Sequence, residues 1–166
     1  ESDYFIFRGQ VARTQTFGGT RVGDDYRGRW VAFAKLEAQV ADGPLVHAEQ
    51  MGIGGANSVR GYKEREFLGD HGVSGTLEIR TPILLGVFSR LAQHLFPRWT
   101  PGEVPADRLQ LVTFADVGYI SVQDALPGQE SSETLVSAGA GLRLAVTQYS
   151  QLKFDWGFPL EETSES

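Results

Sequence analysis

The sequence contains no cysteine and a single methionine among its 166 residues. The absence of cysteine excludes disulfides, zinc thiolates, iron–sulfur clusters and a cysteine nucleophile. There is no run of basic residues, and 15 basic against 21 acidic side chains give a formal net charge of −6. That balance argues against nucleic acid as a partner. No apolar run reaches the roughly 18 residues that a membrane-spanning helix needs.

What the chain does contain favours β structure. It has 20 Gly, together with 10 Phe, 5 Tyr and 3 Trp, and glycine with aromatic residues and few helical patterns is typical of strands and turns. Apolar and polar residues alternate with a period of two over up to seven segments, and side chains on a strand point alternately to its two faces. The predicted strands are 4–14, 30–40, 45–53, 73–81, 109–120, 134–146 and 151–160.

Four predicted strands have one apolar and one polar face: 30–40, 73–81, 134–146 and 151–160. The strands 4–14, 45–53 and 109–120 alternate less cleanly. Two-faced strands are typical both of a water-soluble β-rich binding domain and of a membrane barrel. A soluble domain buries the apolar face, whereas a membrane barrel turns it to lipid and keeps a polar lumen. Strands of about 9 to 13 residues suit a tilted membrane crossing. Aromatic residues end the apolar faces, as in an interfacial girdle; they are Trp30, Tyr119, Trp156 and Phe158. We therefore predict an antiparallel up-and-down transmembrane β-barrel, with the soluble domain as the alternative.

The connections between these strands predict a direction. Short links at 41–44 and 148–150 alternate with long polar links at 15–28, 54–72 and 121–133. Outer-membrane barrels keep short turns in the periplasm and long loops outside, so the first strand is expected to run outward. One connection, 82–108, is too long for a periplasmic turn, and its segment 84–96 is compatible with a short amphipathic helix.

Familiar catalytic and ligand-binding motifs are absent. The glycine-rich segment 52–57 is followed by more loop and by no helix, so it does not predict a phosphate cradle. His47, His71 and His94 lack the spacing of a zinc site, and no Gly-x-Ser-x-Gly elbow is present. We predict no catalytic residue, no metal and no cofactor. An outer-membrane hydrolase stays an alternative, because a catalytic triad need not be local in sequence.

Two motifs carry a family resemblance. The first is Val59-Arg60-Gly61-Tyr62, preceded by Gly54-Gly55 and followed by Gly69-Asp70-His71-Gly72 and Leu77-Glu78-Ile79-Arg80; the second is Phe114-Ala115-Asp116-Val117-Gly118. In this order and setting they strongly resemble the two-partner secretion transporters (TpsB proteins) of the Omp85 superfamily, outer-membrane barrels that export haemolysins and adhesins.

The resemblance implies that the tetrad lies at the tip of a loop folded into the lumen. Asp116 alternates with Leu111, Ala115 and Val117, so it faces the lumen if those residues face lipid. The guanidinium of Arg60 is a planar fork suited to a carboxylate. The resemblance implies that Arg60 reaches Asp116, with Glu78 as a second acceptor and with Phe114 and Gly118 completing the wall motif. Gly61 would allow the turn and Tyr62 would pack against the inner wall.

The same resemblance implies a function. The protein would be part of an outer-membrane pore that secretes a partner exoprotein, and its Arg60–Asp116 pair would position the loop in the lumen. Its other expected partners are outer-membrane lipid and the barrel assembly machinery. The family barrel has about sixteen strands and is preceded by POTRA domains, so residues 1–166 are expected to be the C-terminal part of a barrel domain. A factor that inserts other barrels into the outer membrane is the alternative within the superfamily.

Overall fold

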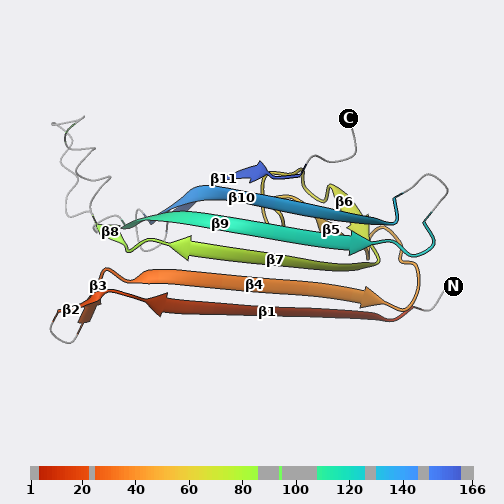
Figure 1. The fold of residues 1–166 in the computed structure, drawn as a ribbon, viewed down its shortest axis with the longest axis horizontal. Coiled ribbons are helices and arrows are strands. Elements are labelled where there is room, and N and C mark those ends of the chain that lie inside the picture. Colours follow the sequence, from red (N-terminus) through yellow and green to blue (C-terminus); the bar gives the residue numbers. More distant parts are fainter. Residues whose placement is uncertain are drawn as a thin grey trace.

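The computed structural model describes residues 4–22, 25–85, 94, 108–125, 130–145 and 150–161. Its main feature is one antiparallel sheet with the spatial order β1-β4-β7-β9-β10-β11 (Figure 1). Each long strand pairs with the long strand that follows it in the sequence, which confirms the predicted all-β, up-and-down architecture. The six long strands are β1 (Ile6–Phe17), β4 (Trp30–Ala41), β7 (His71–Arg80), β9 (Arg108–Ser121), β10 (Ser132–Ala145) and β11 (Gln151–Pro159).

Five short strands complete the described secondary structure. The pair β2 (Thr20–Val22) and β3 (Asp25–Arg27) forms one hairpin, and β5 (Met51–Ile53) with β6 (Phe67–Gly69) forms another. The two-residue strand β8 (Leu84–Leu85) pairs with the start of β9. The helix expected over 84–96 begins with β8, and apart from residue 94 its remainder lies outside the described residues. Within those ranges no helix has the length and apolarity needed to cross a bilayer.

The strand predicted over 45–53 is wrong as a member of the sheet. Only its last three residues are extended, and as β5 they pair with β6 and not with a wall strand. Residues 47–49 form a turn, in which Glu49 N–H donates to Val46 O at 2.8 Å. Leu45, Met51 and Ile53 would share one face of a strand, but His47 and Glu49 interrupt that face and Val46 would point to the other. The sheet therefore has six long strands and not seven.

The absence of that strand changes which connections lie at the same end of the sheet. The connection that contains the β2–β3 hairpin lies at one end of the sheet, with β8 and the start of β11; this is called the hairpin end. The connection 42–70 and the connection from β9 to β10 lie at the other end, called the loop end (Figure 1). The long links 15–28 and 54–72 were expected at the same end, and they lie at opposite ends because 45–53 does not cross.

Along the strands, most large apolar side chains lie on the exposed face and several polar ones lie on the buried face, although β9 also buries apolar residues. On β9 the buried residues are Val112, Phe114, Asp116, Gly118 and Ile120, whereas Leu111, Val117 and Tyr119 alternate with them and remain 45%, 48% and 43% exposed. On β7 the same alternation buries polar Ser74, Thr76 and Glu78 and exposes Leu77 and Ile79. A polar inner face and an apolar outer face are the pattern of a barrel wall in lipid.

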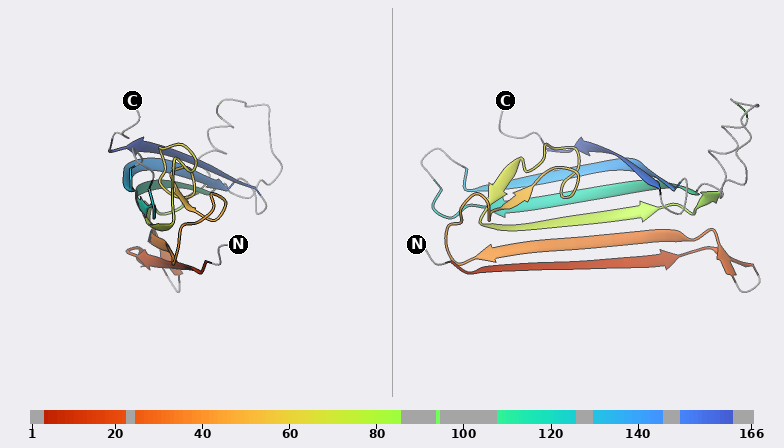
Figure 2. Two further views of the ribbon diagram at one scale, coloured as in Figure 1. Left: turned by 90° about the vertical axis from the view of Figure 1, so that its right-hand side faces the viewer. Right: turned by 180° about the vertical axis from the view of Figure 1, so that it is seen from behind.

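The sheet curves around the connection 42–70. Viewed along the strands, it forms an arc, and the β5–β6 hairpin with the loop that it carries lies on the concave side (Figure 2). The four aromatic residues expected at the interfaces lie on the outer face at 40–75% exposure. Trp30 begins β4 at the hairpin end and Tyr119 lies toward the loop end, whereas Phe158 stands opposite Ala138 near the middle of β10. The concave face is therefore where the candidate site must be sought.

Candidate functional site

The loop that carries the Val59–Tyr62 tetrad folds back from the loop end over the inner face of the sheet. Its stem is the β5–β6 hairpin, and Gly54 and Gly55 leave the stem at φ +101° and +92°, a region that side chains disfavour. A Cβ on Gly54 would lie 2.5 Å from Lys63 O, so glycine is also required by space. Glu64 accepts a hydrogen bond from Ala56 N–H at 3.2 Å and narrows the loop. The loop is thus closed on itself before it reaches the wall.

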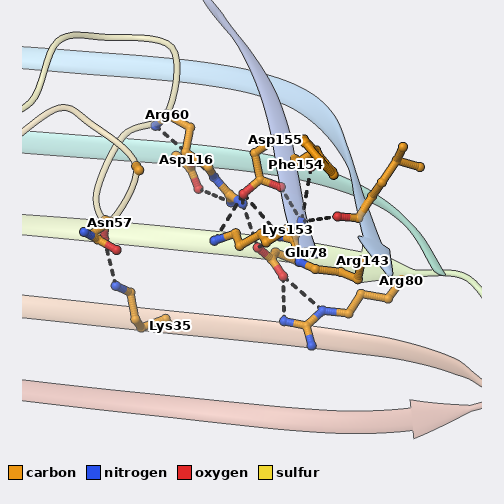
Figure 3. Close-up of polar contacts among 12 residues, drawn as sticks. Lys35, Asn57, Arg60, Glu78, Arg80, Asp116, Arg143, Lys153, Phe154 and Asp155 are labelled. Atoms are coloured by element: carbon orange, nitrogen blue, oxygen red, sulfur yellow. Dashed lines mark hydrogen bonds and ion pairs between the residues drawn. The ribbon is translucent and has the colours of Figure 1, made fainter. Parts of the chain in front are cut away.

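Arg60 is the centre of the contact between loop and wall. Its Nε and Nη2 donate to the two oxygens of Asp116 at 2.7 and 2.9 Å, and its backbone N–H donates to the same carboxylate at 3.1 Å (Figure 3). Its Nη1 donates to Glu78 Oε1 at 2.7 Å. The guanidinium also lies 3.5 Å from the ring centroid of Phe114, within the range of a cation–π contact. Arg60, Asp116 and Glu78 are only 5%, 2% and 5% exposed.

The strand register explains why these residues meet one guanidinium. Phe114 stands opposite Glu78 across the β7–β9 pair, and Asp116 is two residues further along the same face of β9. Arg60 lies over this patch and satisfies both carboxylates with one planar fork. A buried cation whose partners are hydrogen-bonded is stable, whereas any member left alone would be an uncompensated buried charge.

The network extends to residues that sequence reasoning did not assign to the site. Asp155 on β11 lies 3.4 Å from Arg60 Nη1 and is also bound by Arg143 of β10 and by Lys153, the latter at 3.1 Å. Arg80 binds the second oxygen of Glu78 at 2.7 Å. Alternation predicted inner faces for these residues, but no local motif links them to Arg60. We call Arg60 with Glu78, Asp116 and Asp155 the clasp.

The other members of the two motifs fit the loop against the wall. Val59 is fully buried in an apolar cluster with Ile53, Ile120 and Leu135. A Cβ on Gly118 would lie 2.8 Å from Val59 Cγ2, so this glycine makes room for the loop. Gly61 turns at φ +99°. Tyr62 packs on the cluster, and its hydroxyl donates to Val136 O at 2.9 Å.

Sequence reasoning also missed Gly157 on β11. A Cβ there would lie 2.6 Å from Arg60 C and 2.7 Å from Gly61 N, and a Cβ on Gly61 would lie 2.9 Å from Gly157 C. Loop and strand therefore touch backbone to backbone at two glycines. In the sequence only the glycine itself indicated this contact, and a glycine in a strand can equally mark a bulge or a bend.

The base of the loop is fixed by a fully buried carboxylate, Asp70. It accepts hydrogen bonds from Leu45 N–H at 2.8 Å, from Gln50 Nε2 at 3.1 Å and from Gln123 N–H at 2.7 Å. Burial acts to raise the pKa of Asp70, but these hydrogen bonds and the nearby charge of His71 outweigh it and hold the pKa below its ordinary value. Asp70 thus joins the connection 42–70 to the β9–β10 connection.

Acidification is expected to weaken the attachment of the loop at Asp70. The pKa of Asp70 is lower in the folded than in the unfolded chain. Its contribution to the stability of the folded state is therefore fully present above the ordinary carboxyl pKa of about 3.9, and it is lost as the pH falls through the lower folded value. Asp70→Asn should reduce stability at neutral pH by about 2 kcal/mol and should flatten the response to acid. Protease resistance of the loop, measured against pH, tests this. Asp42→Asn, an exposed acid of the same connection, should behave as wild type; an equal loss there would contradict the assignment.

The fold and the site together define a class: a curved antiparallel wall with an apolar outer face, a polar inner face and a loop fixed inside by an arginine. Residues 7–144 match the family model described as haemolysin secretion/activation protein ShlB/FhaC/HecB. The chain therefore belongs to this family, the two-partner secretion transporters of the Omp85 superfamily, which are transporters rather than enzymes. Family and β-rich fold point to a Gram-negative outer-membrane protein. No curated protein matches the chain.

Proposed function

We propose that the chain is the C-terminal part of an outer-membrane pore that exports a partner exoprotein. The apolar outer face would contact lipid, and the inner face would line the path of the exported polypeptide. The family match over residues 7–144 supports export as the activity. In the complete protein, further strands and POTRA domains would accompany this chain, and the barrel assembly machinery would insert it.

We further propose that the clasp positions the loop in the lumen. The observation that carries this role is the forked contact of Arg60 with Asp116 at 2.7 and 2.9 Å inside a 2–5% exposed cluster. A loop held in this way occupies part of the lumen, so its position sets how much of the path is open. No reaction is required of any residue in this arrangement. The other residues of the two motifs would act by fitting the loop tip against the inner face of the sheet; they are Val59, Gly61, Tyr62, Phe114 and Gly118.

Deletion of the complete gene should abolish release of the partner exoprotein into the medium and leave other outer-membrane proteins at normal levels. Complementation with the wild-type gene should restore release. The measurement is an immunoblot of medium, periplasm and outer membrane for the exoprotein and for several unrelated barrels. A general loss of outer-membrane barrels would instead support the barrel-insertion alternative and would overturn the export proposal.

A further inference from the structure

A hollow lies on the inner face between the tetrad and the hairpin end. Its volume is about 560 Å³, and its walls come from β4, β7, β9, β10 and β11 with the loop as its roof. Its lining is strongly basic, because Glu78 is the one carboxylate among the residues that line it in the described part of the chain. The cations that line it are Lys35, Arg60, Arg80, Arg108, Arg143 and Lys153.

The positive charge remains after the ion pairs are counted. Four carboxylates pair with these six cations, so the group carries a net charge of 6 − 4 = +2 in a chain whose total is −6. The four are Glu37, Glu78, Asp116 and Asp155. A basic concavity in an acidic chain concentrates anions, and its low-dielectric walls strengthen the field.

Donors in the hollow are still available to a ligand. Arg108 makes no side-chain hydrogen bond or ion pair with the part of the chain that the structure describes, although it lines the hollow. The side chain of Lys153 is 54% exposed and has one ion pair, to Asp155. By contrast Arg60 is committed to the clasp. The donors that a ligand could bind therefore lie at the hairpin-end side of the hollow, away from the loop tip. Phe33 and Ile83 also line the space, so it offers apolar contact beside charge.

We propose that this basic hollow binds carboxylate-bearing segments of the polypeptide in transit. The inference rests on the proposed export function and adds the chemistry of the substrate that the lumen holds. The hollow is on the inner face, opposite the apolar surface, so a polypeptide crossing the lumen passes it from either end. Ion pairs in a solvated lumen are weak, which suits a substrate that must be held and then released.

A direct test measures binding to the purified full-length protein in detergent. The probes are a fluorescently labelled acidic peptide of Glu, Ser and Gly and the same peptide with Lys in place of Glu, titrated by anisotropy at low salt. The acidic peptide should bind about fivefold more tightly, since one solvated ion pair contributes up to about that factor. Arg108→Glu should weaken its binding about fivefold, Arg108→Gln should weaken it less, and added salt should weaken it in all.

Arg13→Gln is the matched control, because it removes the same charge from the opposite, outer face of the sheet: Arg13 shares a face with Val11 and stands opposite Ala34. It should leave binding unchanged. Equal binding of the two peptides, or no effect of Arg108→Glu, would overturn the inference. Competition by inorganic phosphate at equal anion concentration would show a small-anion site and would overturn it too. Exoprotein release, measured in the deletion strain, tests the export proposal separately. If the wild-type gene does not restore release, the export proposal is refuted, whatever the peptide-binding result.

Discussion

Replacement of Arg60 by alanine is expected to free the loop from the wall and to disrupt exoprotein release. The change removes the fork that neutralises Asp116 and Glu78, which are 2% and 5% exposed. Asp116 would then be buried without its cation, whereas Glu78 would keep its contact with Arg80. Breaking such a desolvated pair costs about 3–5 kcal/mol, less where water enters. Because Arg60 makes the main polar contacts between the loop tip and the wall, a loss of that size should shift the loop from mostly bound to the wall to mostly detached.

The position of the loop can be read separately from export. This chain has no cysteine, so Ser137→Cys introduces one reporter thiol within it. Ser137 is fully buried on the inner face and stands opposite Asp116 across the β9–β10 pair. A water-soluble maleimide should react slowly with this thiol when the loop is seated and much faster in combination with Arg60→Ala.

Two further variants separate geometry from charge. Arg60→Lys keeps the cation but not the fork, so its labelling rate and exoprotein release should lie between those of wild type and Arg60→Ala. Arg13→Ala removes an arginine from the outer face and should match wild type in both measurements. Unchanged labelling and release in Arg60→Ala would contradict the role given to the clasp.

The faces of the sheet could be predicted from the sequence because they depend only on period two. Once Leu111, Ala115 and Val117 form the apolar face, Asp116 must point the other way, and β9 has that arrangement. The same reasoning placed Glu78 on the polar face of its strand. In the structure the tetrad lies on the loop over the inner face, and the second motif lies on β9.

Register and loop path could not be predicted, because they depend on pairing over long sequence distances. The Arg60–Asp155 contact spans 95 positions and joins a loop to a strand that carries no motif. Likewise, the segment 45–53 contains enough apolar residues to imitate a strand. What distinguishes it is the carboxylate of Asp70, which captures Leu45 N–H at 2.8 Å and holds the chain in a turn. Asp70 is 25 residues from Leu45 in the sequence, so a local pattern of apolar and polar residues cannot predict this hydrogen bond.

Substitution of Gly157 by alanine is expected to have the second largest effect on the loop, without changing any charge. The added methyl group would lie 2.6 Å from Arg60 C and 2.7 Å from Gly61 N. Both neighbours are backbone atoms, so relief requires the loop tip to move away from β11. Overpacking of this kind costs about 1–3 kcal/mol. The displacement would lengthen the Arg60–Asp155 contact first, since at 3.4 Å it is the longest bond of the clasp.

Gly75→Ala is the matched control for that experiment, because this glycine is also in a strand of the wall but its nearest neighbour to an added Cβ is Val117 Cγ1 at 3.4 Å, an ordinary contact. The Ser137→Cys thiol should label faster in Gly157→Ala and at the wild-type rate in Gly75→Ala. Gly157→Val should enhance the effect, because a branched side chain needs still more room beneath the tip. If labelling instead stays slow in both Gly157 variants, the loop does not rest on β11, and the wall motif on β9 alone holds it.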